Sequence, residues 1–140
     1  MSTSTAEKPP YEGTTEIPKA LSVKDDRSMA TISHFGGVLG CIPSAIIYAT
    51  MRHRGRFTAQ ESREALNFTL LPSLVILLSI PLAPLPFIGW FFGMIAALCW
   101  VWLAVMSLMA GIVVNRGNPY QYRFNTALFD RLVQRRRAKR

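Results

Sequence analysis

A long stretch without charge constrains this chain more than any other feature. Between Glu64 and Arg116 there is no Asp, Glu, Lys or Arg, and prolines between 81 and 86 interrupt the run in its middle. A bilayer requires about 20 apolar residues for each spanning helix, and backbone polar groups inside it must be satisfied by the segment itself. The stretch therefore predicts two membrane-spanning helices, over residues 66–82 and 88–114, joined by a tight uncharged link.

A second charge-free block comes earlier, over residues 28–51. It is long enough to cross the hydrocarbon once at about 1.5 Å per residue, so it predicts a third, N-terminal span. Pro43 removes one helical hydrogen bond and should kink that helix near its centre. Gly36 and Gly40, four residues apart, predict a flat face for helix packing. The alternative is a re-entrant hairpin bent at Pro43, which would keep both chain ends on one side.

Small residues recur at the same spacing in the last span. Gly89 with Gly93 near its start, and Ser107 with Gly111 near its end, predict two further faces for close helix packing. The span is long for a hydrocarbon core of about 30 Å, so the helix should tilt or project beyond the bilayer.

The polar stretch before residue 66 predicts where the second span begins. Thr58 followed by Glu61 has the form of a capping box, in which the two residues satisfy each other's backbone N–H groups. Charged residues fill the first turns after this cap, so the helix should start at the membrane surface. We expect an interfacial helix start over residues 58–66 that continues into the span.

The two ends of the chain differ in composition. Residues 1–27 are rich in Ser, Thr, Pro, Glu and Lys and lack the apolar core of a signal peptide, which predicts a disordered tail. Residues 28–124 form the membrane module, and residues 125–140 predict a basic amphipathic helix, with Leu128 and Leu132 on its apolar side.

The net charge of +8 is uneven, because half of the 16 Lys and Arg residues lie after Asn115. No nucleic-acid-binding motif accompanies these residues, so the excess predicts contact with an anionic lipid leaflet and no nucleic-acid partner. The basic residues expected to face lipid are Arg52, Arg54, Arg56, Arg131, Arg135, Arg136 and Arg137.

The same residues predict an orientation. The link near residue 85 has no basic residue, whereas segment 52–63 and the C-terminal tail are rich in them. Basic segments favour the cytoplasmic side, so both should be cytoplasmic and the link should lie outside. With three spans, the N-terminus would then lie outside a multi-pass protein of the cell membrane.

Four polar residues near the membrane surface, His34, Glu61, Glu64 and Asn67, are the candidate polar interface motif. An ionisable group inside a membrane is a functional candidate, yet His34 lies near the start of its block, which favours a neutral, hydrogen-bonded histidine. Glu61 and Glu64 share a helical face and could serve acid–base chemistry or cation binding, but solvated charges paired with nearby arginines are the simpler interpretation. Asn67 could hydrogen-bond between helices.

No pattern in the sequence predicts an enzyme. There is no nucleophile elbow, phosphate-binding loop or zinc-ligand spacing, and Cys41 and Cys99 lie in apolar runs far from other metal ligands. A b-type haem would need a second buried axial ligand besides His34, and His53 in a basic turn is badly placed for it. We therefore expect no catalytic residues, no metal and no cofactor.

Short motifs carry a family resemblance. At Ser33-His34-Phe35-Gly36-Gly37, at Pro43 and at Glu61-x-x-Glu64-Ala65-Leu66-Asn67-Phe68, the chain resembles a family of small uncharacterised bacterial membrane proteins. That family looks related to the channel-like subunit of the protein-import translocon in the chloroplast inner envelope. The resemblance covers residues 29–125 and implies an all-helical membrane module without established catalytic activity. The more distant kinship implies a role in translocation.

Two functions follow as hypotheses. The first is a non-enzymatic structural or accessory subunit, which binds other membrane proteins or further copies of itself through small-residue faces. The alternative is a channel-like or protein-translocation component, which would require an oligomer because three spans enclose no sizeable aqueous path.

Overall fold

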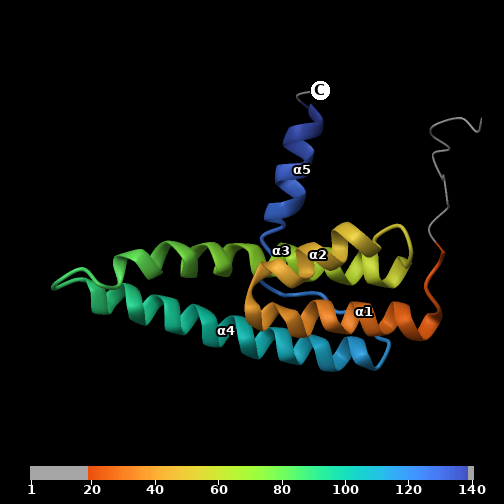
Figure 1. Cartoon of the computed structure of the whole chain (residues 1–140), viewed down its shortest axis with the longest axis horizontal. Helices are drawn as coiled ribbons and strands as arrows, with labels where there is room; N and C mark the ends of the chain where they lie inside the picture. The colour runs from red at the N-terminus through yellow and green to blue at the C-terminus, as the bar shows by residue number, and fades with distance from the viewer. Residues whose placement is uncertain (1–18, 139–140) are drawn as a thin grey trace, which may run out of the picture.

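A computed structural model describes residues 19–138 and shows a bundle of α-helices (Figure 1). In chain order the elements are α1 (Val23–Phe35), the 3-10 turn η1 (Gly36–Leu39), α2 (Cys41–Met51), α3 (Arg56–Ser79), the 3-10 turn η2 (Ile80–Leu82), α4 (Gly89–Asn115) and α5 (Leu128–Ala138). There is no strand in this part of the chain, and the predicted all-α class is confirmed for it.

A long antiparallel hairpin of α3 and α4 runs the length of the bundle (Figure 1). Arg56–Leu82 and Gly89–Asn115 are both long and apolar enough to cross a membrane. They contain the predicted span 66–82 and all of the predicted span 88–114 except residue 88. The half of the hairpin nearest its tip projects beyond α1 and α2, and it exposes large apolar side chains such as Leu77, Trp90 and Leu98. Such an uncovered apolar surface suits contact with lipid.

The first charge-free block does not form one spanning helix. Its chain runs toward the hairpin tip in α1, turns, and runs back in α2 (Figure 1). The two ends of the block meet, because the backbone N–H of Leu21 donates to the carbonyl of Arg54 at 2.8 Å. The prediction of one continuous helix over residues 28–51 is therefore wrong, and the chain reverses within the block, as the alternative hairpin has it.

The break between α1 and α2 lies at Gly40 and not at Pro43. Gly40 has φ 93° and ψ −158°, a conformation that essentially only glycine adopts. Pro43 lies in the first turn of α2, where a missing N–H removes no helical hydrogen bond. The hydroxyl of Ser73 in α3 accepts from the N–H of Cys41 at 2.9 Å and so fixes the start of α2. Pro43 therefore begins a helix where a central kink was expected.

The start of α1 corrects two expectations. Residues 23–27 are helical, although they belong to the tail predicted to be disordered, and residues 1–18 of that tail lie outside the described residues. Ser22 caps the helix, since its hydroxyl accepts from the N–H of Asp25 at 3.1 Å. Because Leu21 lies beside Arg54, the described chain begins at the same end of the bundle as the basic turn. Three spans would place these two segments on opposite sides of the membrane, whereas the structure has them side by side. The side of the membrane on which they lie stays a prediction.

The start of α3 lacks the capping box predicted from Thr58 and Glu61. The helix begins earlier, at Arg56, and the N–H groups of Phe57 and Thr58 donate to the Asp26 carboxylate at 3.2 and 2.7 Å. A carboxylate at a helix N-terminus is also favoured by the helix dipole. Asp26 at the beginning of α1 therefore supplies the cap of α3.

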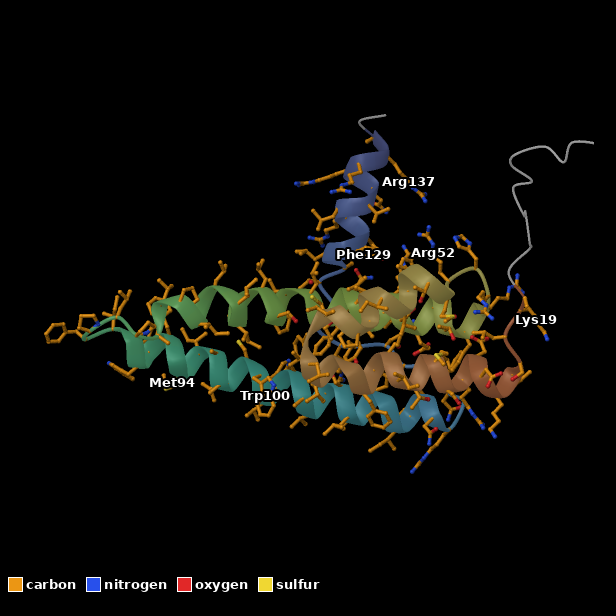
Figure 2. All side chains as sticks on the ribbon, in the orientation of Figure 1. Lys19, Arg52, Met94, Trp100, Phe129 and Arg137 are labelled. Carbon is orange, nitrogen blue, oxygen red and sulfur yellow. The ribbon has the colours of Figure 1, made fainter. Side chains whose placement is uncertain are left out.

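The last helix, α5, leaves the bundle crosswise to α3 and α4 (Figures 1 and 2). It corresponds to the amphipathic helix predicted for residues 125–140, of which 139 and 140 lie outside the described residues. Its first turn is held by Phe129, whose ring meets that of Tyr48 edge-on at 5.4 Å between centroids. Since α3 and α4 would cross the bilayer, a helix crosswise to them would lie along the membrane surface.

Candidate functional site

A buried polar network joins α1, α3 and the chain that follows α4. His34 Nε2 lies 3.1 Å from Glu61 Oε2, and His34 Nδ1 lies 2.9 Å from the Tyr122 hydroxyl. His34 and Glu61 are fully buried and Tyr122 is 4% exposed. A neutral imidazole with its proton on Nε2 satisfies both contacts, because it donates to the carboxylate and accepts from the phenol.

The two glutamates bind the backbone of the returning chain. The N–H of Tyr120 donates to Glu61 Oε2 at 3.2 Å, and the N–H of Tyr122 donates to Glu64 Oε1 at 3.0 Å. Neither carboxylate forms an ion pair with an arginine among residues 19–138, so the simple interpretation of solvated, arginine-paired charges does not describe them. The segment after α4 therefore runs along α3 as a strap held by carboxylates.

Asn67 continues this row of contacts to α5. Its amide nitrogen donates to Asp130 Oδ2 at 3.0 Å, and its carbonyl oxygen accepts from the N–H of Asp130 at 3.2 Å. Arg63 Nε donates to Asp130 Oδ1 at 2.6 Å, and this hydrogen bond raises the pKa of Arg63 although partial burial opposes it. Asp130, the one acid of the basic tail, thus attaches α5 to α3.

Aromatic stacking completes the network. The Tyr122 ring lies parallel to that of Phe68, with 3.9 Å between centroids and 1° between planes. The ring of Tyr120 meets the Tyr122 ring edge-on, with 5.0 Å between centroids. Burial raises the pKa of the Tyr122 phenol, so it remains protonated and available as a donor.

Sequence reasoning missed three members of this arrangement: Tyr122 as the partner of His34, Asp130 as the anchor of α5, and Asp26 as the cap of α3. Two weak signals were present. Tyr120 and Tyr122 alternate directly after the last span, and Asp130 is isolated among basic residues.

The small residues predicted for helix packing serve mainly within the bundle. Ser107 and Gly111 lie on the face of α4 that contacts α1. A side chain at Gly111 would collide with the ring of Phe35, and one at Gly37 would collide with Ser107. These residues therefore set the close approach of α1 to α4.

The surroundings of Gly36, Gly89 and Gly93 differ. A side chain at Gly36 would overlap Pro43, so this contact closes the α1–α2 hairpin. At the tip, Gly89 packs against the backbone of Ala83, whereas the position of a Cβ on Gly93 has nothing within 4 Å. Gly93 therefore presents an open small-residue surface on the outside of α4.

The basic residues form two groups. Those of the turn after α2 contact their surroundings, since Arg52 Nε donates to His53 Nε2 at 2.9 Å and Arg54 Nε donates to the carbonyl of Lys19 at 3.0 Å; Arg56 opens α3. Those of α5 are exposed (Figure 2), and they are Arg131, Arg135, Arg136 and Arg137.

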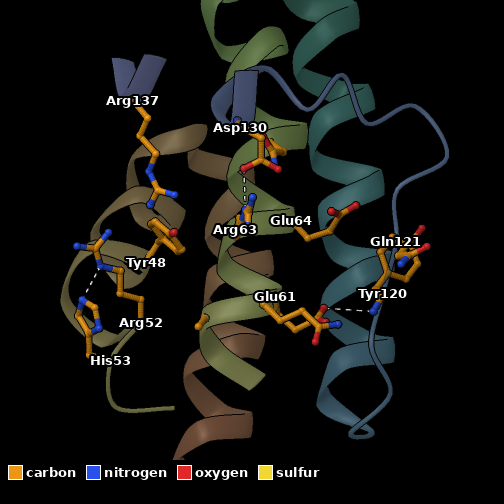
Figure 3. A pocket seen from close by; sticks show the side chains of 13 residues that line it. Tyr48, Arg52, His53, Glu61, Arg63, Glu64, Tyr120, Gln121, Asp130 and Arg137 are labelled. Carbon is orange, nitrogen blue, oxygen red and sulfur yellow. Dashed lines mark hydrogen bonds and ion pairs between the residues drawn. The ribbon is translucent and has the colours of Figure 1, made fainter. Parts of the chain in front are cut away.

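A polar cavity of about 660 Å³ opens beside the network (Figure 3). It brings together Glu61, Glu64 and Asn67 of the predicted motif, whereas His34 lies outside its lining. The lining comes from α2, the turn after it, α3, the strap and α5. It consists of Tyr48, Arg52, His53, Ala59, Gln60, Glu61, Arg63, Glu64, Asn67, Tyr120, Gln121, Asp130 and Arg137. No group of three or more His, Cys, Asp or Glu side chains placed to hold a metal ion occurs within residues 19–138.

Comparison with known families covers every member of this network except Asp130. Residues 25–129 match the family model of the magnetosome magnetite crystal formation proteins, MamF/MmsF. This chain belongs to the MamF/MmsF family. The predicted membership in a family of small bacterial membrane proteins is confirmed, while no finding shows the kinship of MamF/MmsF proteins with the chloroplast translocon. No curated protein and no solved structure gives a significant match.

Proposed function

We propose that this protein is a non-enzymatic accessory membrane protein in magnetite crystal formation, and that it works through contacts with other membrane proteins or further copies of itself. The observation that carries the proposal is the uncovered half of the α3–α4 hairpin, where Leu77, Trp90 and Leu98 are 65%, 70% and 63% exposed. Uncovered helices in a bilayer can associate by close packing of their surfaces. The family description supports the mineral setting.

The polar network supports a non-enzymatic role. Its histidine, carboxylates and phenol hydrogen-bond within the protein, where they hold the strap and α5. The His34–Glu61 pair is fully buried. A catalytic acid or base must reach its substrate within hydrogen-bond distance. The sealed pair therefore favours a structural role.

Copurification tests the accessory role. The tagged chain, extracted from native membranes in mild detergent, should be recovered with a stable partner or as a homo-oligomer. Gly93→Leu should weaken this assembly without disturbing the fold, because Gly93 faces open space. Met94→Leu is the control: it keeps the size of the side chain at the adjacent exposed position, so it should leave the assembly intact. A strictly monomeric protein without partners would contradict the proposal.

The mineral setting has its own test. Deletion of the gene should change the size or shape of the magnetite crystals, measured by electron microscopy of whole cells. A host that forms no magnetite, or unchanged crystals, would contradict this part while leaving the copurification result to decide the accessory role.

The re-entrant α1–α2 hairpin favours a second candidate, a channel-like or translocation component. Irregular segments within membranes are tolerated where protein or a water-filled cavity surrounds them. Two long helices per chain enclose no aqueous path, so an oligomer would be needed. Reconstituted liposomes should then pass ions, small solutes or peptides, and a lack of flux under every gradient tested would remove this candidate.

For the location, we propose that the basic turn and α5 face the cytoplasm and that the turn at residues 83–88 lies on the other side. The unequal distribution of basic residues supports this orientation. The exposed arginines of α5 would then contact anionic lipid of the cytoplasmic leaflet.

A further inference from the structure

We propose that two copies of this chain pair in parallel through the outer face of α4. The pairing rests on the accessory role proposed above, because it names the partner in that role as a second copy of the chain. Two features of α4 carry it: a regular row of exposed apolar side chains, and the position of the last part of that row relative to α5.

The row runs along most of α4. Its members are all exposed, and they are Met94, Leu98, Val101, Val105, Leu108 and Ile112. Successive members are alternately four and three residues apart, which is the spacing of the a and d positions of a coiled coil. Within a bilayer, an apolar helix face suits lipid as well as protein. The part of the row that lies outside the hydrocarbon therefore decides between these two partners.

The position of α5 indicates where the hydrocarbon would end along α4. Asp130 in the first turn of α5 binds Asn67 of α3. Trp102 of α4 meets Phe124, which lies just before α5, with 6.0 Å between ring centroids. The arginines of α5 are exposed, and a charged side chain within the hydrocarbon is costly. With the hairpin embedded in a membrane, α4 beyond Trp102 would therefore lie among headgroups and water.

This last part of α4 exposes large apolar side chains. Val105, Leu108 and Ile112 are 49%, 45% and 51% exposed. The start of α3, which lies at the same end of the bundle (Figure 1), exposes polar side chains such as Gln60 and Arg63. Lipid tails would not cover α4 at this level, and a contiguous apolar patch outside the hydrocarbon marks a protein contact. The last part of the row therefore favours a protein partner over lipid.

The residue types in this part favour a second copy of α4 as that partner. In the heptad register of the row, Val105 and Ile112 occupy a positions and Leu108 occupies a d position. Val or Ile at a with Leu at d favours a parallel pair of two helices. Two copies inserted in one membrane have the same direction, so a two-fold axis along the bilayer normal would relate them. Each side chain of the row would then meet its own counterpart.

Disulfide cross-linking of the full chain in native membranes tests the pairing. In a background without Cys41 and Cys99, Leu108→Cys and Ile112→Cys should each form a covalent dimer on oxidation, resolved by non-reducing electrophoresis. Ile46→Cys is the matched control and should stay monomeric. Ile46 is 57% exposed, and it lies on α2, which makes no contact with α4 in the described part of the chain. A lack of dimers at both α4 positions, or equal cross-linking of the control, would overturn the pairing.

Cross-linking and copurification together separate the pairing from the accessory role. If copurification recovers a stable partner of another kind while the α4 cysteines stay monomeric, the accessory role stands and the pairing is wrong. If the chain is recovered alone as a monomer and the α4 cysteines do not cross-link, both are wrong.

A charge within the row should break the pair. Leu108→Glu would place two like charges opposite each other in a contact that excludes water, so the dissociation constant of the dimer should rise about tenfold. Analytical ultracentrifugation in detergent would measure it. Ile46→Glu introduces the same charge on α2 and should leave the constant unchanged. Both side chains are exposed, so neither change should unfold the bundle, which circular dichroism would verify. Equal dissociation constants of the two variants would contradict the pairing.

Discussion

At the residue scale, the contact between His34 and Tyr122 joins positions 88 residues apart in the chain. It seals the strap against α1, while Glu61 and Glu64 fix the same strap to α3. The sequence singled out His34 and both glutamates as polar residues at the membrane surface. Their partners are backbone N–H groups and a tyrosine far along the chain, which no local spacing can reveal.

Removal of the Tyr122 hydroxyl should destabilise the fold. Tyr122→Phe keeps the ring on Phe68 but leaves His34 Nδ1 buried without a donor. We expect the free energy of unfolding to fall by about 1–3 kcal/mol, measured by chemical denaturation in detergent. Tyr120→Phe is the matched control, since the structure gives the Tyr120 side chain no hydrogen bond within residues 19–138. An equal loss in both variants would show that the hydroxyl contact contributes nothing.

Alkaline pH should weaken the same contact. Burial raises the pKa of Tyr122, so above pH of about 10 the unfolded state releases a proton that the folded state retains. The stabilisation is complete below that pH and is lost as pH rises further. Denaturation at a series of pH values should show a steeper decline for the unchanged protein than for Tyr122→Phe. Parallel declines would argue against a buried, neutral Tyr122.

At the element scale, the α1–α2 hairpin depends on a single backbone conformation. In block 28–51 the sequence predicts a kink at Pro43 and a helix-packing face at Gly36 and Gly40. Length and hydropathy cannot distinguish one crossing from two half-crossings, because both bury the same apolar residues. The positive φ of Gly40 turns the chain back, and the contacts of Asp26 and Ser73 to neighbouring helices hold the reversed path in place.

Gly40→Ala should therefore destabilise the hairpin by about 1–3 kcal/mol, since alanine is strained at this φ and ψ. Gly93→Ala is the control, because Gly93 is helical, faces open space and should gain about 0.5–1 kcal/mol from the substitution. Thermal unfolding followed by circular dichroism would compare them. Similar stabilities of the two variants would show that the turn adapts without cost.

At the scale of the whole molecule, the start of α1 lies at the same end of the bundle as the last turns of α2 and α4 (Figure 1). The all-helical class, the two long helices and the terminal amphipathic helix could be predicted from hydropathy, because a bilayer restricts the structures that can span it. The number of membrane crossings could not be predicted from hydropathy, because it depends on whether α1 and α2 fold back against α3 and α4.

Labelling with a membrane-impermeant thiol reagent should report this arrangement. In a background without Cys41 and Cys99, Leu85→Cys should react from outside intact cells, whereas Ala20→Cys and Asn118→Cys should be protected until the cells are opened. Labelling of Ala20→Cys together with Leu85→Cys would restore the three-span topology. Labelling of Ala20→Cys and Asn118→Cys alone would invert the orientation.

The turn between η2 and α4, residues 83–88, is free of charged side chains, and so is everything from Ala65 to Asn115. In the proposed orientation, a neutral loop would be all that the α3–α4 hairpin must carry across the bilayer during synthesis. Each charged side chain at the centre of the membrane would cost about 2.5–3.5 kcal/mol during insertion. In the orientation proposed above, the hairpin would enter as one unit from the ribosome's side, and α1, α2, the strap and α5 would assemble around its near end without crossing.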